Sequence, residues 1–364
     1  MGAVWGNNIQ FTIFGESHGT AIGGVLSNLP AGFDIDFAKV DYELSRRNHR
    51  AFYSTSRAEP DKYEILSGVM DGRVTGAPLA FEIRNCDTRS GDYARLDVIP
   101  RPGHSDYPAS VRYGGANDYR GGGHFSGRIT APLVFAGAIA RQYLATRGIN
   151  LCAHIASIGN VQGKRFDEMG PDRETTERLH GMMFPVLDES YVDAMRGEIE
   201  ACRAEGDSVG GVIECAITGL DAGIGEPFFG SVESELARML FSIPAVKGVE
   251  FGAGFDIAHM KGSQANDPYR MENGKVTAVT NRNGGILGGI TNGAAVIFRM
   301  AVKPTPSIFK AQQTVDLHKK ENAVLELKGR HDACIVPRAV PVAEAAAALV
   351  LFDMMNGGAA WQNI

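Results

Sequence analysis

The sequence predicts an α+β fold in which a layer of helices lies between antiparallel β-sheets. Two stretches, 131–148 and 340–355, are apolar almost all the way round at helical spacing, which is typical of helices buried on every side. Most other apolar runs are short and compatible with hairpins, and turn residues separate them. No Pro/Ser/Gly-rich or charged linker divides the chain, so residues 1–364 are predicted to form a single domain, a β-α-β sandwich.

The individual elements follow from the spacing of apolar residues. The strand-like runs are residues 9–14, 21–28, 63–69, 78–84, 151–158, 209–218 and 293–302. The helix-like runs are residues 36–47, 128–147, 189–205, 231–242 and 338–355. Gly148 is expected to end the second of these helices. Pro341 is expected in the first turn of the last helix and Gly357 after its end. The helix at 189–205 mixes charged and apolar residues at helical spacing, so we expect it on the surface.

The composition excludes several classes of protein. With 44% hydrophobic and 21% charged residues and a net charge of −6, the chain is not a general nucleic-acid or membrane-surface binder. The five cysteines are scattered without a CxxC pair, which indicates reduced thiols and neither a disulfide framework nor a zinc site. No signal peptide is visible, and residues 340–355 are too short to span a bilayer, which needs about 20 apolar residues. We therefore expect a cytoplasmic protein.

Glycine is over-represented, with 45 of 364 residues, and it borders most of the polar candidates for a functional site. Clustered glycines mark places where the backbone turns sharply or approaches something closely. The polar, glycine-bordered segments are "FGESHG" (14–19), "RPGHSDY" (101–107), "DYRGGGHFSGRIT" (118–130), "GGILGGITNG" (284–293), "KPTPSI" (303–308) and "GRHDACIVPR" (329–338).

Each segment alone also fits an ordinary structural element. His18 suits a hairpin turn, His104 suits a surface position, "KPTPS" suits an exposed loop, and "GRHD" suits a helix cap with a local salt bridge. No dinucleotide-binding or P-loop pattern is present, and no histidine pair at i, i+4 indicates a metal. The recurrence of oxyanion donors, imidazoles and a carboxylate on such turns favours a site for a phosphorylated, carboxylated ligand.

Taken in order, these segments resemble the chorismate synthase family over nearly the full length of the chain. The resemblance rests on "FGESHG", "RNCDTRSGDY" (84–93), "IPRPGHSDY" (99–107), "DYRGGG" (118–123), "AVKGVEFGAGF" (245–255), "NGGILGGITNG" (283–293), "KPTPSI" and "GRHDACIVPRAVPVAEA" (329–345). It implies a β-α-β sandwich with helices between antiparallel sheets, assembled as a homotetramer.

The resemblance also implies an activity. Members of this family catalyse the last step of the shikimate pathway, which leads to the aromatic amino acids. In that step 5-enolpyruvylshikimate 3-phosphate loses phosphate and a C6 hydrogen in an anti-1,4 elimination that gives chorismate. The enzyme is a carbon–oxygen lyase. It requires reduced FMN although no net redox change occurs, and NADPH is the reductant in some members.

The resemblance also implies roles for individual residues at positions that match the family pattern. The resemblance implies that His18 protonates reduced FMN, that His104 donates a proton towards the leaving phosphate, and that Asp332 assists proton removal through the flavin N5. Residues implied to hold FMN are His124, Phe125, Ser126, Pro244, Ala245, Gly288, Lys303, Pro304, Thr305, Pro306, Ser307 and Arg330. Substrate or NADP contacts are implied for Arg47, Arg128 and Arg338.

Two departures from the family pattern bear on these roles. The usual "GGGRSSARET" is "GGGHFSGRIT" here, so His124 and Phe125 replace an arginine and a serine, and Ile129 replaces a glutamate. Histidine still donates hydrogen bonds and phenylalanine still stacks, so we expect the role to survive in altered form. The basic tract after Arg46 and Arg47 is one residue shorter, and "NHRAFY" (48–53) offers only His49 and Arg50 as replacements. We therefore expect dependence on a separate flavin reductase or a reducing cytosol rather than on NADPH.

Two other functions are compatible with the same sequence segments. One is a different flavin- or phosphosugar-dependent enzyme that keeps the same anion-binding loops. The other is a flavin-binding module without catalytic activity. The joint presence of His18, His104 and Asp332 argues against the inactive module.

Overall fold

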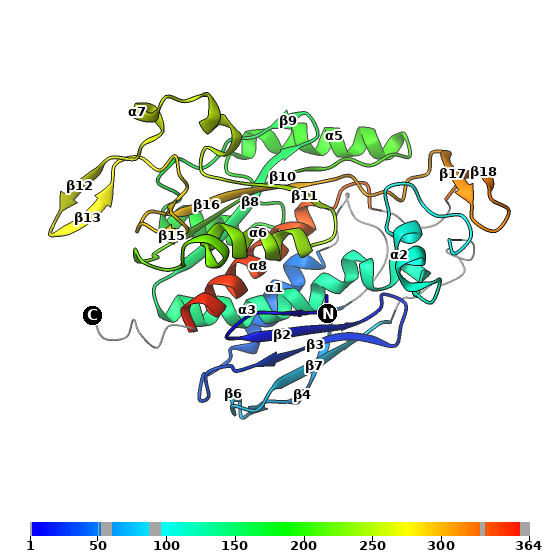
Figure 1. The fold of residues 1–364 in the computed structure, drawn as a ribbon, viewed down its shortest axis with the longest axis horizontal. Helices are drawn as coiled ribbons and strands as arrows, with labels where there is room; N and C mark the ends of the chain where they lie inside the picture. The colour runs from blue at the N-terminus through cyan, green and yellow to red at the C-terminus, as the bar shows by residue number, and fades with distance from the viewer. Residues whose placement is uncertain (1, 50, 52–59, 87–95, 328–331, 357–364) are drawn as a thin grey trace.

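The computed structural model describes residues 2–49, 51, 60–86, 96–327 and 332–356. Within them, two five-stranded antiparallel sheets enclose a layer of helices (Figure 1). The first sheet has the strand order β1-β2-β3-β7-β4 and the second has the order β11-β16-β10-β8-β9. The predicted α+β class, with helices between antiparallel sheets, is confirmed.

The N-terminal part of the chain builds the first sheet. Its strands are β1 (Val4–Trp5), β2 (Gln10–Gly15), β3 (Ala21–Ser27), β4 (Tyr63–Ser67) and β7 (Leu79–Arg84). β-Branched and aromatic residues on the inner face, such as Phe11, Ile22 and Phe81, are buried against the helices. The loop between β2 and β3 carries "ESHGT" and opens at one end of this sheet.

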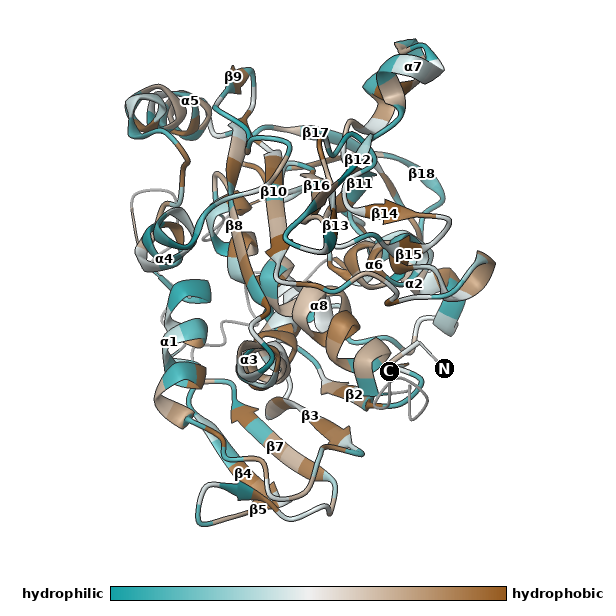
Figure 2. Ribbon diagram, turned by 90° about the vertical axis from the view of Figure 1, so that its left-hand side faces the viewer, coloured by the Kyte–Doolittle hydropathy of each residue, from teal (hydrophilic) through white to brown (hydrophobic). Residues whose placement is uncertain are grey.

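The second sheet is buried more deeply than the first. Its strands are β8 (Asn150–Ile158), β9 (Val161–Gln162), β10 (Gly211–Thr218), β11 (Val246–Phe251) and β16 (Val296–Val302). Eight of the nine residues of β8 are buried because α8 covers one face and other segments cover the second. Figure 2 shows β8, β10 and α8 as predominantly hydrophobic ribbons.

The helical layer joins the two sheets. It contains α1 (Phe37–Arg47), α3 (Thr130–Thr146), α6 (Val232–Ser242) and α8 (Val336–Asn356). A methyl group on Gly137 of α3 would lie 2.3 Å from Cβ of Ala345 on α8, so small residues let these helices pack very closely. α3 ends at Thr146 and Gly148 follows with a φ of +76°, as the sequence predicted.

One detail of the last helix was predicted wrongly. α8 begins at Val336, so Pro337 takes the first turn and Pro341 lies inside the helix. The helix continues because flanking residues of α8 are buried between the sheets, and their packing outweighs the one backbone hydrogen bond that proline removes. Gly357 lies outside the described residues.

The remaining elements surround the sandwich. They are α2 (Asp106–Tyr113), α4 (Arg173–Gly181), α5 (Val192–Ala204), α7 (Gly262–Ala265) and the small hairpins β5–β6 (Val69–Met70, Arg73–Val74), β12–β13 (Tyr269–Glu272, Lys275–Ala278), β14–β15 (Ile286–Leu287, Ile290–Thr291) and β17–β18 (Gln312–Asp316, Glu321–Leu325). α5 buries only Met195 and Ile199 and lies on the outer side of the second sheet, as predicted (Figure 1). The sequence analysis missed α2, α4, β11 and these hairpins because their apolar runs are short.

Among the described residues, α8 alone has the length and apolarity of a membrane span, but 78% of its apolar window is buried inside the protein. Its neighbours on both sides are strands and helices of the sandwich, so the helix serves as the core of the fold.

Candidate functional site

Two histidines lie against one glycine turn. Gly121, Gly122 and Gly123, in the turn segment Arg120–Phe125, all have positive φ values of 60°, 86° and 52°. A methyl group on Gly121 would lie 2.0 Å from Nδ1 of His18, and one on Gly122 would lie 3.0 Å from Nε2 of His104. Consecutive Cα atoms are about 3.8 Å apart. The turn therefore brings both imidazoles to one place, and only glycine leaves room for them there.

His18 is held by its own loop and by the turn. The neighbouring Ser17 donates its backbone N–H to the carbonyl of Gly123 at 3.1 Å and its hydroxyl to the carbonyl of Gly121 at 3.0 Å. The Ser17 hydroxyl also lies 3.2 Å from Nδ1 of His18. Both side chains are buried, with exposed fractions of 0% for Ser17 and 7% for His18. The "GESHG" loop is thus docked onto the glycine turn, and it does not form a solvated hairpin.

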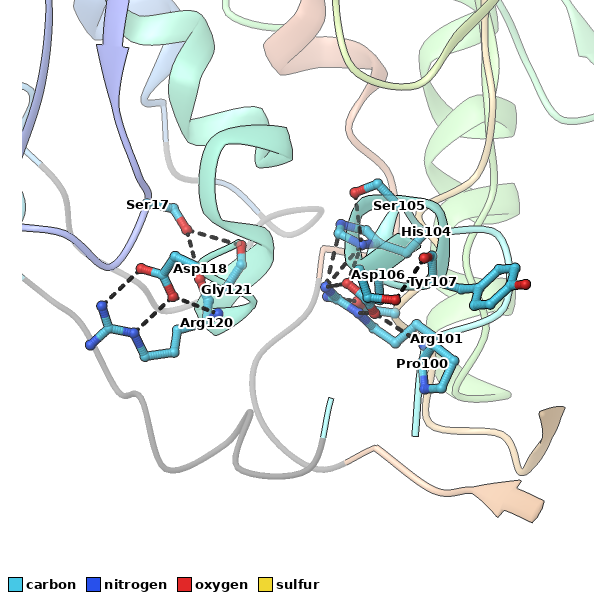
Figure 3. A network of polar contacts seen from close by, with 12 residues as sticks. Ser17, Pro100, Arg101, His104, Ser105, Asp106, Tyr107, Asp118, Arg120 and Gly121 are labelled. Atoms are coloured by element: carbon cyan, nitrogen blue, oxygen red, sulfur yellow. Dashed lines mark hydrogen bonds and ion pairs between the residues drawn. The ribbon is translucent and has the colours of Figure 1, made fainter. Parts of the chain in front are cut away.

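His104 stands at the start of α2 in a second polar cluster (Figure 3). Its Nδ1 is 2.5 Å from Oδ1 of Asp106. Arg101 donates from Nε to Oδ2 of Asp106 at 2.7 Å, from Nη2 to Oδ1 at 2.8 Å, and from its backbone N–H to Oδ2 at 3.0 Å. Although burial alone would raise the pKa of Asp106, the bonds from Arg101 and His104 hold it well below its usual range.

The "KPTPSI" loop faces this cluster. Arg101 donates from Nη1 to the hydroxyl of Ser307 at 3.1 Å. A methyl group on Gly103 would lie 3.8 Å from Nζ of Lys303 and 3.6 Å from Cβ of Pro306. Lys303 in turn donates its backbone N–H to the carbonyl of Ala245 at 2.9 Å. The structure therefore places Lys303–Ser307 beside the His104 cluster and Ala245 next to Lys303.

Two features of this loop region suit an anionic ligand. Partial burial, together with the nearby positive charge of Lys247, lowers the pKa of Lys303, so an anion beside it would relieve an unfavourable arrangement. Ala245 has a φ of +76°, a left-handed conformation that costs a residue with a Cβ about 1–2 kcal/mol. Such strain is found most often at binding and catalytic sites.

Asp332 and Arg338 connect this loop to α1. Thr305 donates its hydroxyl to the carbonyl of Asp332 at 3.0 Å. Arg338 donates from Nη1 to Oδ2 of Asp332 at 3.1 Å and from Nε to the carbonyl of Arg47 at 3.0 Å. The predicted catalytic acid is therefore paired with a predicted substrate-binding arginine.

Arg47 and Arg128 share one carboxylate. Arg47 donates from Nη1 to Oδ2 of Asp61 at 2.7 Å, and Arg128 donates from Nη1 to Oδ1 of the same residue. Arg128 also donates from Nε to Oδ1 of Asn85 at 3.2 Å. The Nδ2 group of Asn85 donates to the carbonyls of Glu16 and Gly19, both at 2.9 Å. Asn85 therefore links Arg128 to the loop that carries His18. Both arginines are buried.

The residues that replace the family's usual Arg-Ser pair lie at the rim of the turn. His124 donates from Nδ1 to the carbonyl of Gly15 at 2.8 Å, and its side chain is exposed. Phe125 is 37% exposed, with its ring 6.4 Å from that of Tyr113. Ser126 caps the following 3₁₀ turn by accepting the N–H of Arg128 at 3.3 Å.

One residue predicted to hold FMN lies apart from this cluster, and one lies outside the described residues. Gly288 lies in the turn between β14 and β15, and Figure 1 shows β15 at the opposite end of the molecule from α2. Arg330 lies outside the described residues.

Sequence reasoning missed four contributors: Ser17, Asp61, Arg101 and Asp106. Arg101 and Asp106 occupy the same "RPGHSD" segment as His104, so their spacing around a Pro-Gly turn was a usable signal. Asp61 lies in "EPDKYE" beside unremarkable charged residues, and only the fold brings it between two arginines.

A second ionic cluster lies in the helical layer. Oxygen and nitrogen atoms of Glu43, His180 and Glu344 lie within 4.8 Å of one another, as metal ligands do. Arg46 donates from Nη1 to Glu43 at 2.8 Å and to Glu344 at 2.5 Å, and Arg141 donates to Glu344 at 2.9 Å. Two guanidinium groups already neutralise these carboxylates, so the cluster does not suit a metal cation.

Comparison with known proteins identifies relatives over almost the whole chain. Residues 9–356 match the family model described as chorismate synthase. The chorismate synthase of Thermococcus kodakarensis is 44% identical over 360 residues, covering 99% of both chains. That of Methanosarcina mazei is 46% identical over 355 residues, covering 97% of this chain and 96% of the relative. A crystal structure of chorismate synthase superposes with a TM-score of 0.76 at 27% identity, covering 96% of this chain and 92% of that one.

Proposed function

The chain belongs to the chorismate synthase family, a family of lyases, and we propose that it converts 5-enolpyruvylshikimate 3-phosphate into chorismate and phosphate. In this anti-1,4 elimination the bond between carbon and the phosphate oxygen breaks, a hydrogen leaves C6, and a second ring double bond forms. The observation that carries the proposal is the placement of His18 and His104 against adjacent glycines of one turn.

The protein's own residues account for the proton transfers and the charge. His104 lies closest to the Lys303–Ser307 loop and is proposed to donate a proton towards the leaving phosphate. His18 is proposed to hold a proton on the other side of the glycine turn. Asp332, held by Arg338, is proposed to assist removal of the C6 hydrogen. Histidine suits the first two roles because its ordinary pKa lies close to neutral pH.

The positive groups near the turn suit a substrate with one phosphate and two carboxylates. Arg101, Arg338 and Lys303 border the candidate site, and Arg47 and Arg128 are linked to the His18 loop through Asp61 and Asn85. Arginine forks match carboxylate and phosphate oxygens in pairs. Arg47 itself is buried and donates to Asp61, Thr130 and Gly127, so its part in substrate or NADP binding stays a prediction.

The residues present also fit the family's flavin. Lys303, Thr305, Ser307 and His124 carry polar groups near the glycine turn, and such groups suit the polar atoms of a flavin. When bound, reduced FMN would supply an electron-rich ring that assists loss of phosphate without net oxidation. Gly288, in the turn between β14 and β15, lies at the end of the molecule opposite α2, which argues against its holding the same FMN within one subunit.

We also propose an oligomeric state, a domain organisation and a cellular location for the protein. A homotetramer is supported by Phe228, Phe229 and Phe255, which are between 83% and 93% exposed. A single domain over residues 1–364 is supported by one hydrophobic cluster that reaches both sheets. A cytoplasmic location is supported by five free cysteines.

The reductant is proposed to come from a separate flavin reductase or a reducing cytosol. Arg47, the one NADP-binding position that keeps its place in the family pattern, is engaged with Asp61 and Thr130. Anaerobic incubation of the protein with NADPH, FMN and substrate should therefore give no chorismate. Sustained turnover that Arg47→Ala abolishes would contradict this.

The activity itself is tested by anaerobic incubation of the protein with dithionite-reduced FMN and 5-enolpyruvylshikimate 3-phosphate. We expect chorismate and phosphate to appear in equal amounts, with the flavin still reduced at the end. Oxidation of one flavin per product would overturn the redox-neutral reaction. The absence of both products would overturn the assignment.

A further inference from the structure

A buried carboxylate holds the ring of His104. Asp106 has an exposed fraction of 6%, and its Oδ1 lies 2.5 Å from Nδ1 of His104. We propose that Asp106 is a positioning residue for the elimination, which keeps a proton on Nδ1 of His104 and presents Nε2 to the glycine turn. This inference rests on the proposed function for the chemical role of His104.

The direction of the ring follows from its neighbours. Nε2 faces Gly122, where a methyl group would lie 3.0 Å from it, and Nδ1 faces away, towards Asp106. An ionised carboxylate only accepts hydrogen bonds, so the proton between Nδ1 and Oδ1 belongs to the imidazole. A neutral imidazole with its proton on Nδ1 accepts at Nε2, and an imidazolium donates there.

Arg101 supports this arrangement without competing for Nδ1 in the ring plane. Its Nη2 lies 3.0 Å from Nδ1 and 3.3 Å from Nε2 of His104. A point in the ring plane at both distances would overlap with Cε1, so the guanidinium nitrogen lies over the face of the ring. The in-plane hydrogen-bonding position at Nδ1 of His104 is therefore available to Asp106. Ser105 approaches Nδ1 only to 3.4 Å.

Arg101 also keeps Asp106 charged inside the protein. A buried carboxylate normally gains a proton because desolvation penalises its ionised form. Three bonds from Arg101, at 2.7, 2.8 and 3.0 Å, favour the ionised form instead. Both side chains are nearly closed to solvent, with exposed fractions of 5% for Arg101 and 2% for Asp106. The carboxylate therefore remains an acceptor for His104 at the pH of the cytosol.

The test is a double-mutant cycle with Asp106→Asn and His104→Ala, measured anaerobically with reduced FMN. Asparagine keeps the shape but offers an N–H group that favours the opposite tautomer. We expect Asp106→Asn alone to lower kcat by about 100-fold, with KM changed less than threefold. In the His104→Ala background the same change should cost less than about threefold, because Asp106 acts through His104. Equal losses in both backgrounds, or no loss in either, would overturn the proposal.

Asp118→Asn is the matched control. Asp118 accepts two bonds from the Arg120 side chain, both at 2.8 Å, and it lies near the same turn, but among the residues that the structure describes its side chain makes no hydrogen bond to an imidazole. We expect kcat within about threefold of wild type. A loss as large as that of Asp106→Asn would mean that any arginine-paired carboxylate near the turn matters, which contradicts a specific role.

A second measurement does not depend on activity. In protein labelled with ¹⁵N-histidine, the His104 resonances are assigned by their disappearance in His104→Ala. We expect Nδ1 of wild-type His104 to be protonated, and a neutral ring with its proton on Nε2 would overturn the proposal. If the wild type makes no chorismate, the proposed function fails, and the tautomer still decides whether Asp106 orients the ring.

Discussion

The helical layer and the glycine turn use the same ionic chemistry in different surroundings. In the helical layer, Glu344 accepts from Arg46 and Arg141 and from the backbone N–H of Ala153. Near the turn, Asp106 accepts from Arg101 and His104. Each carboxylate is buried, each is shared by two nitrogen-bearing side chains, and each has a pKa below its usual range.

What differs is the space around the charges. Glu344 sits on α8 among helices that pack tightly, beside Gly137 and Ala345, and this leaves no position for a ligand larger than water. The site cluster lies on loops around Gly121 and Gly122, where glycine leaves room for the imidazoles of His18 and His104. A buried ion pair by itself therefore says little about function. Its contact with an imidazole that lies against a glycine turn says much more.

The largest expected effect lies at the turn. His18→Ala and His104→Ala should each lower turnover by about 10²–10⁴-fold, because each removes a positioned proton donor or acceptor. The thermal midpoint should change little, since neither imidazole fills the main hydrophobic core. Anaerobic turnover and thermal unfolding measure the two quantities separately. Turnover within twofold of wild type would remove that histidine from the mechanism.

The helical-layer cluster should show the opposite pattern. Glu344→Gln leaves Arg46 and Arg141 short of a counter-charge and should lower the free energy of unfolding by about 3–5 kcal/mol. Turnover per folded molecule should stay close to that of wild type at a low temperature. Urea unfolding and activity on the same sample check both. A large loss of turnover without a loss of stability would contradict a purely structural role for the helical-layer cluster.

The same cluster predicts a pH dependence. Burial raises the pKa of Glu344, but Arg46 and Arg141 outweigh it and hold that pKa below the usual value. The folded state then binds its proton less readily than the unfolded state does. The stability from Glu344 is complete above the ordinary glutamate pKa of about 4.3 and is lost as the pH falls below it. Urea titrations between pH 7 and 3 should show a shallower decline for Glu344→Gln than for wild type, and parallel declines would contradict this.

Alanine variants of two glycines separate the effect of a steric clash from the effect of backbone strain. Gly121→Ala would place a methyl group 2.0 Å from His18, whereas Gly114→Ala meets nothing within 4 Å. Both positions have φ near +60°, so both variants carry a similar backbone cost of about 1–2 kcal/mol. We expect only Gly121→Ala to lower turnover, by more than about tenfold, since it displaces a proposed acid–base group. Equal turnover in the two variants would show that the close approach to His18 is unimportant.

The smallest effect concerns binding order. The positive groups around the turn repel one another until anions occupy the site, so substrate should tighten FMN binding by about 1–3 kcal/mol, or 5- to 150-fold. Fluorescence titration of FMN with and without substrate measures this. Equal affinities would mean that the two ligands do not share one charged site.

The fold was predictable from the sequence where the apolar pattern is long. The two buried helices and seven main strands lie close to their predicted positions, because their residues are apolar on every side or alternate cleanly. Short elements such as α2 and β11 carry too few apolar residues for a period to be read. The interior position of Pro341 was missed because a proline usually marks the first turn, and burial between two sheets overrides that tendency.

The candidate site was predictable in its motifs but not in its contacts. The glycine-bordered segments identified His18, His104 and Asp332 by residue type. That Gly121 meets His18 and Gly122 meets His104 depends on how the β2–β3 loop packs on the segment before α3, which no local pattern encodes. The sharing of Asp61 by Arg47 and Arg128 depends likewise on residues far apart in the chain.

The most direct test of the central claim is a crystal structure of the protein with FMN and 5-enolpyruvylshikimate 3-phosphate bound. We expect the substrate to lie against the Gly121–Gly122 turn, with Nε2 of His104 within about 2.6–3.2 Å of a phosphate oxygen and His18 within reach of the flavin. Substrate bound elsewhere, with neither imidazole in reach of it or of the flavin, would rule out the proposed roles of both histidines.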